Sequence, residues 1–113
     1  MKIRDDKRLS TDDIYQALRQ HEQNLSENEF TTKYLKTSRS YLCNRRNKRR
    51  DVSSDVLLNL YSELYGIGST WERMATSERN SKTRERWQHK AAAYAHLADQ
   101  VIAKLLERAR ERA

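Results

Sequence analysis

The stretch SRSYLCNRRNKRR, residues 38–50, begins with two serines around an arginine, contains one leucine and ends in basic residues. A serine at a helix start accepts hydrogen bonds from free backbone N–H groups, so Ser38 is suited to cap a helix that reaches Asn47. The stretch holds no acidic residue to balance its arginines and its lysine. We therefore predict a short helix whose positive charge meets a partner outside the segment.

A second short helix is predicted directly before this one. The residues SENE, 26–29, form a capping box, in which the serine and glutamate side chains satisfy each other's backbone N–H groups. The helix that begins there directs Phe30, Tyr34 and Leu35 inward. Residues 36–38 leave no room for a longer loop, so the two helices have the spacing of a helix-turn-helix.

Further helices are predicted on both sides of this pair. A first helix begins at Ser10 or Thr11, and its apolar face consists of Ile14, Ala17 and Leu18. A fourth helix begins near Ser53 and ends at Gly66, because glycine often follows the C-terminus of a helix. Its inward residues, at helical spacing, are Val56, Leu57, Leu60 and Leu64.

The C-terminal part of the chain has the longest helical pattern. The residues STWE, 69–72, are a second capping box and predict the start of a fifth helix. Asn80 and Ser81 mark the most favourable interruption, so residues 70–112 form either one helix or two. Apolar residues then recur every three or four positions along one side: Trp87, Ala91, Tyr94, Ala95, Ala98, Val101, Ile102, Leu105 and Ala109.

The composition favours an all-α fold. The 113 residues include no proline and two glycines, so little besides side-chain caps interrupts a helix. We predict a compact helix-turn-helix bundle of four to five helices, followed by a long C-terminal helix or helical hairpin. We assign DNA binding to residues 1–67 and dimerisation to residues 68–113.

The charge of the chain points to a polyanionic partner. A net charge of +7 and a pI near 9.8 suit DNA, RNA or an acidic membrane surface, and charge alone does not choose among them. No stretch approaches the roughly 20 apolar residues of a membrane span, and MKIRDDKRLS lacks the apolar segment of a signal peptide. The single cysteine, Cys43, suits a reducing compartment, so we expect a cytoplasmic protein.

With its flanking residues, the opening stretch resembles a known family. LKTSRSYLCNRRNKRR, residues 35–50, is similar to the turn, recognition helix and following loop of lambda-repressor-like (phage Cro type) helix-turn-helix proteins. The matching features, in order, are the capping box, Ser38-Arg39-Ser40, Leu42, Asn47 and the Arg49-Arg50 pair. The resemblance covers about residues 11–67. The sequence departs from the family pattern at Lys36 and Lys48, where glycines are usual, and at Arg45, where the family has an apolar residue.

The resemblance implies a DNA site. Arg39, Ser40 and Asn44 match positions that reach base edges in the major groove. Arginine suits guanine, asparagine suits adenine, and serine can bond either base. Tyr41 either touches a sugar or thymine methyl or packs against the preceding helix. Contacts to phosphates, which add affinity without sequence information, are expected from Asn28, Arg45, Asn47, Lys48, Arg49 and Arg50.

A homodimer is expected, because a helix-turn-helix monomer covers only one half-site on double-stranded DNA. The apolar stripe on the last helix exceeds what a small bundle needs, and we predict that it pairs with a second copy. The alternative is that the stripe packs back on its own chain. The predicted dimer interface consists of Trp87, Ala91, Tyr94, Ala98, Val101 and Leu105.

Other functions compete with the expected regulation of transcription through DNA. An adaptor or anti-regulator would bind another protein through the long helix, and an RNA-binding protein would need aromatic residues on a sheet. Cys43 is expected to be a small surface or half-buried residue; the alternative is a redox sensor, whose thiolate the neighbouring arginines would favour. We find no catalytic constellation, cofactor motif or metal-ligand spacing, since His89 and His96 lie seven residues apart without a thiol or carboxylate partner. No small-molecule ligand is predicted.

Overall fold

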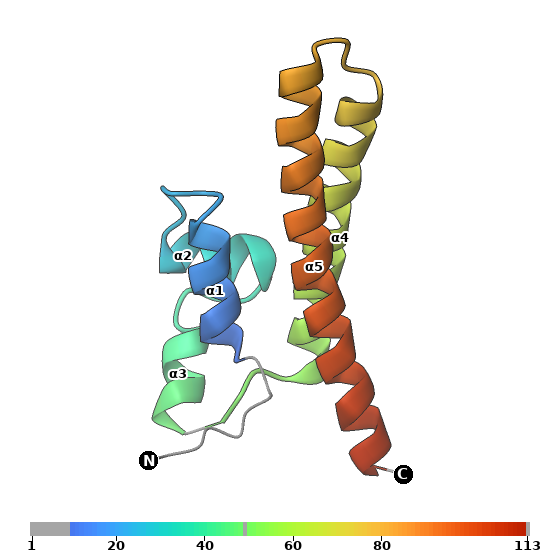
Figure 1. The fold of residues 1–113 in the computed structure, drawn as a ribbon. Helices are drawn as coiled ribbons and strands as arrows, with labels where there is room; N and C mark the ends of the chain where they lie inside the picture. Colours follow the sequence, from blue (N-terminus) through green and yellow to red (C-terminus); the bar gives the residue numbers. More distant parts are fainter. Residues whose placement is uncertain (1–9, 49, 113) are drawn as a thin grey trace, which may run out of the picture.

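The computed structural model describes residues 10–48 and 50–112, and within these ranges the chain is all-helical, without a strand. Figure 1 shows a small bundle of short helices lying beside a long helical hairpin. We call the first four elements the N-terminal bundle and the last two the hairpin. In chain order the elements are α1 (Thr11–Arg19), α2 (Glu27–Glu29), the π-helical turn η1 (Phe30–Tyr34), α3 (Tyr41–Asn47), α4 (Ser54–Thr76) and α5 (Ser81–Arg112).

Side-chain caps begin the first helices where the sequence predicts them. The Asp13 backbone N–H donates to Ser10 Oγ, and the Ser10 N–H donates to the Asp13 carboxylate, both at 3.1 Å. Ser26 and Glu29 repeat this reciprocal arrangement at the start of α2. The predicted starts of both helices are confirmed. The sequence could predict them because the cap is a local interaction between residues three apart.

The start of α3 differs from the prediction by two residues. The helix follows Ser40, not Ser38, and the Ser40 side chain makes no capping bond. Ser38 belongs to the preceding turn, where its carbonyl accepts from the Tyr41 N–H at 3.1 Å and the Thr37 N–H returns to Thr31 O. Ser38, which the sequence assigned to the cap, is therefore part of the turn and does not cap α3. The end of α3 at Asn47 is as predicted.

The hairpin corrects two further expectations. Ser53 caps α4 as predicted, but α4 continues through Gly66 to Thr76, and residues 69–72 lie inside it instead of starting a helix. A glycine inside a helix costs about 1 kcal/mol, which packing against α5 offsets. The interruption predicted at Asn80 and Ser81 is confirmed, with the Asn80 side chain accepting from the Thr83 N–H at 3.0 Å. The C-terminal segment is thus a hairpin, not one helix.

One buried core joins the bundle to the hairpin. Buried residues of α1 and η1 belong to the same cluster as buried residues of α4 and α5. The boundary predicted between residues 67 and 68 falls inside α4, so the two segments share their core, and the division of roles between them stays a prediction.

The apolar stripe of α5 faces its own chain. Four of the six residues predicted for the dimer interface are at most 5% exposed against α4 and the bundle: Ala91, Tyr94, Ala98 and Val101. Trp87 is half-buried beside Trp71, and Leu105 packs against the common core. This burial agrees with the alternative, in which the stripe packs back on its own chain because the bundle and α4 need it to close the core.

Candidate nucleic-acid interface

The polar residues that the sequence assigns to base contacts lie at the start of α3: Asn44 is in the helix, Ser40 is its N-cap residue and Arg39 is in the turn before it. Leu42 is only 4% exposed and anchors the helix on the core. Arg39, Ser40 and Asn44 are exposed, and within the described residues their side chains make no hydrogen bond or ion pair. Residues 40 and 44 are four apart, so they share one helix face. Donors and acceptors on this face are therefore available to a ligand.

The turn before α3 has an unusual backbone conformation at Lys36. Its φ is +56°, in the left-handed region that favours glycine because a Cβ is crowded there. The Lys36 amino group pairs with Glu63 of α4 at 3.1 Å, and Asn59 donates to the Leu35 carbonyl at the same distance. Contacts with α4 thus stabilise this turn, in which Lys36 stands where the helix-turn-helix family usually has glycine.

Two residues of α3 have structural contacts that the sequence did not specify. Tyr41 is half-buried against the core, and its hydroxyl accepts from the Ser53 N–H at 3.0 Å, which favours the packing alternative for this ring. Arg45 lies over Tyr41 and donates from Nε to the Asp51 carbonyl at 2.8 Å. The Arg45 guanidinium therefore holds the chain between α3 and α4, and its contact with a phosphate stays a prediction.

Arg46, which the sequence analysis did not single out, connects α3 to the starts of two other helices. Its guanidinium lies 2.6 Å from the Asp12 carboxylate of α1 and 2.8 Å from the Glu27 carboxylate of α2. Hydrogen bonds to Glu27 and Asp12 raise the pKa of Arg46 above its usual value. Acidic residues in two first turns were visible in the sequence, but their common partner was not.

Asp51 connects the exit from α3 to the end of α5. Its carboxylate pairs with Lys104 and with Arg108, the latter at 3.3 Å, and accepts from the Thr11 hydroxyl. Burial raises the pKa of Asp51, but the hydrogen bond and charge of Lys104 and the charge of Arg108 outweigh it, so the net shift is downward. This carboxylate is neutralised inside the molecule.

The charges around α3 therefore leave an unbalanced positive surface. Asp12, Glu27 and Asp51 are paired with cations of the same chain. The predicted phosphate contacts Asn28, Asn47, Lys48 and Arg50 are exposed, and no described acidic residue pairs with Lys48 or Arg50. Arg49 lies outside the described residues. The surface consists of Arg39, Ser40, Asn44, Lys48 and Arg50, and we call it the α3 surface.

Cys43 is exposed on α3 beside this surface. The side-chain amide of Asn47 is 4.0 Å from its sulfur, and no second cysteine exists in the chain. A redox role for Cys43 stays a prediction.

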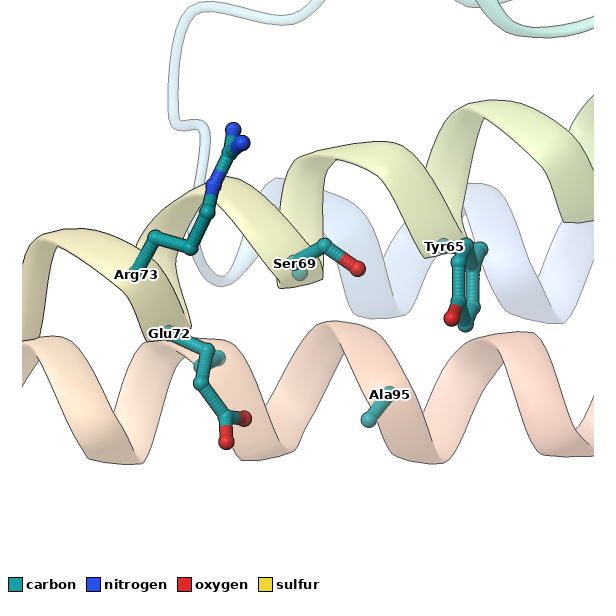
Figure 2. Close-up of a pocket in the computed structure, with 7 residues that line it drawn as sticks. Tyr65, Ser69, Glu72, Arg73 and Ala95 are labelled. Atoms are coloured by element: carbon teal, nitrogen blue, oxygen red, sulfur yellow. The ribbon is translucent and has the colours of Figure 1, made fainter. Parts of the chain in front are cut away.

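A separate groove of about 390 Å³ runs between α4 and α5. In Figure 2, Glu72 reaches from α4 toward α5, Arg73 points away from α5, and Tyr65 lies at one end. Gly68 and Ala95 also line it. Within the described residues, Ser69 has no hydrogen bond to a base, so the groove holds no activated nucleophile.

The described residues hold neither a cluster of metal ligands nor a membrane-spanning helix. No three histidine, cysteine, aspartate or glutamate side chains converge as metal ligands in residues 10–48 and 50–112. No helix within the same ranges has the length and apolar character needed to cross a bilayer.

The fold and the α3 surface define an all-α protein that presents a short polar helix from a bundle built on a long hairpin. The chain belongs to a protein family of unknown function, DUF6626, whose model matches residues 11–113. Comparisons with curated proteins and with solved structures gave no match. The family match includes both the N-terminal bundle and the hairpin, consistent with their common core.

Proposed function

We propose that the protein is a sequence-specific regulator of transcription that inserts α3 into the major groove of double-stranded DNA. The observation that carries this proposal is the α3 surface: an arginine, a serine and an asparagine without internal partners, flanked by unpaired cations. Arginine and asparagine are the side chains that bond guanine and adenine edges most specifically, while Lys48 and Arg50 suit phosphates.

The internal ion pairs support the same function. Unpaired carboxylates beside α3 would repel DNA phosphates. Arg46 pairs with one carboxylate in each of two neighbouring helices, which leaves the three groups with one net negative charge instead of two. The same bridge orients α3 against α1 and α2, which limits the entropy lost when the helix docks. We infer that Arg46 is a positioning residue and not itself a DNA contact.

A homodimer remains part of the proposal, with a changed interface. Two recognition helices about 34 Å apart read successive major grooves, which one chain cannot do. Since the α5 stripe is buried in its own chain, the pairing surface must lie elsewhere. The same burial leaves the alternative adaptor function less apolar surface on the long C-terminal helix.

The test begins with selection of bound duplexes from a random DNA pool, followed by affinity measurements at several salt concentrations. Arg39→Ala should weaken binding to the selected site by about 1–3 kcal/mol and leave random DNA nearly unaffected. Arg50→Ala should weaken both alike and reduce the salt slope by about one unit, because it removes one phosphate contact.

The matched control is Arg73→Ala, which removes an exposed arginine from the distal half of α4. It should leave both affinities unchanged. Failure of the pool to enrich any sequence would overturn the proposal. Equal losses on selected and random DNA for Arg39→Ala would show that α3 does not read bases.

A further inference from the structure

A cleft of about 310 Å³ lies between the N-terminal bundle and the hairpin. Three parts of the chain line it: the segment after α1, the distal half of α4 and the first half of α5. Its volume is at the lower end of the range for small-molecule sites, which begins near 300 Å³. The lining residues are His21, Trp71, Arg86, Trp87, His89 and Lys90.

The lining is rich in nitrogen bases and contains no carboxylate. Arg86 and His89 are exposed, and within the described residues neither forms a hydrogen bond or ion pair. The nearby carboxylate of Glu22 accepts hydrogen bonds from the hydroxyls of Tyr34 and Tyr94. The cleft therefore has positive charge from Arg86 and Lys90 and no carboxylate in its lining.

The environment of His21 reports the same positive field. Partial burial lowers the pKa of His21, and the charges of Lys90 and His89 lower it further, against an opposing effect of Glu22. These nitrogen-bearing side chains face one another across the junction of bundle and hairpin, and Lys90 and Arg86 carry the positive charge. An anion placed among them would relieve their mutual repulsion.

The cleft also presents aromatic surface. The rings of Trp71 and Trp87 meet with centroids 6.1 Å apart at 55°, and both side chains are only half-buried. Lys90 Nζ lies 5.0 Å from the centre of the Trp71 ring. Flat apolar surface beside cations suits a ligand that joins an aromatic ring to an anionic group.

The position of the cleft separates it from the α3 surface. Trp71 and Trp87 flank the end of the hairpin that carries the connecting loop, whereas α3 lies toward the end where α4 begins and α5 finishes (Figure 1). We propose that this cleft binds a small aromatic anion, with its ring against the tryptophans and its carboxylate or phosphate at Arg86, His89 and Lys90. This site goes beyond the proposed DNA binding and does not depend on it.

The chain offers a direct test, because it contains two tryptophans and both line the cleft. In the ¹⁵N-labelled full chain, the two indole N–H signals report only on this site. Titration with 1-naphthoate should shift both signals to saturation with a Kd of about 1 mM or tighter, as expected for a ligand of this size. The neutral analogue 1-naphthalenemethanol should bind at least about tenfold more weakly.

Variants locate the charge that makes this difference. Arg86→Ala combined with His89→Ala removes two exposed side chains and should weaken naphthoate binding at least about fivefold, while the alcohol binds as before. Arg110→Ala is the control, since it removes an exposed arginine from the other end of α5. Each of three results would overturn the proposal: equal binding of naphthoate and alcohol, unchanged binding by the double variant, or larger indole shifts with a DNA duplex.

Discussion

The carboxylate of Glu22 joins the two parts of the molecule through two tyrosines. It accepts hydrogen bonds from the hydroxyls of Tyr34 on η1 and Tyr94 on α5, whose side chains are at most 2% exposed. Burial is the largest cause that raises the pKa of each tyrosine above 10, followed by its hydrogen bond to Glu22. Both hydroxyls therefore stay protonated in the folded protein where free tyrosines ionise.

The raised pKa values of Tyr34 and Tyr94 predict that the free energy of unfolding decreases at alkaline pH. The tyrosines ionise near pH 10 only in the unfolded chain, so their contribution is complete below pH 10 and decreases as pH rises above it. Urea unfolding between pH 7 and 11 should show a shallower alkaline decline for the double variant Tyr34→Phe with Tyr94→Phe. Each single variant should cost about 1 kcal/mol at pH 7.

Tyr65→Phe is the matched control, because this tyrosine is 60% exposed. It should leave both the stability at pH 7 and the alkaline decline unchanged. A double variant with the same alkaline slope as the wild type would show that Glu22 and its tyrosines do not govern this dependence.

At the scale of elements, the two glycines of α4 have different surroundings although they are two residues apart. A Cβ on Gly66 would meet no atom within 4 Å. A Cβ on Gly68 would lie 3.3 Å from Tyr94 Cβ and 3.5 Å from the Ala91 carbonyl oxygen. Gly68 therefore allows α4 and α5 to approach closely, whereas Gly66 only adds flexibility to the unfolded chain.

Substitutions at these glycines should change stability in opposite directions. Gly66→Ala should raise the free energy of unfolding by about 0.5–1 kcal/mol, since helix propensity improves without a clash. Gly68→Val should lower it by about 1–3 kcal/mol, since the added methyl groups push α5 away. Thermal denaturation compares the variants, and a destabilised Gly66→Ala protein would mean that this part of α4 is not helical in solution.

At the scale of the whole molecule, α5 has one face in the core and another in solvent. Val101 is fully buried in the cluster that joins hairpin and bundle, whereas Leu106, five residues on, is 54% exposed. The helix is 32 residues long, about 48 Å at 1.5 Å per residue, close to the 49 Å long axis of the molecule. The folded unit is therefore as long as its longest helix.

Because the apolar stripe of α5 is buried, a charged side chain placed in it should destabilise the fold. Val101→Glu should lower the free energy of unfolding by about 4 kcal/mol or more, because it places an unpaired carboxylate in the core. Leu106→Glu should change it by no more than about 0.5 kcal/mol. Thermal denaturation with light scattering separates the models: a stable Val101→Glu monomer derived from a wild-type dimer would show that the stripe pairs chains after all.

Local interactions account for what could be read from the sequence. Ser10, Ser26 and Ser53 cap the helices predicted for them, and α5 begins after the interruption predicted at Asn80. Each of these signals acts between residues at most four apart, so the chain needs no tertiary contact to express it. The exposure of Arg39 on the candidate site also agrees with its assigned role, which remains a proposal.

Only the tertiary structure decided how these helices are used. Arg46 meets acids 34 and 19 residues away, and Asp51 meets α5 across 57 residues at Arg108, so no spacing rule could pair them. Gly66 has the sequence pattern of a helix end, but α4 continues beyond it because the helix packs against α5. The sequence by itself determined the capped starts of α1, α2 and α4 and the apolar side of the long helices. The fold decided which apolar surfaces cover one another, because burial depends on what is near in space and not along the chain.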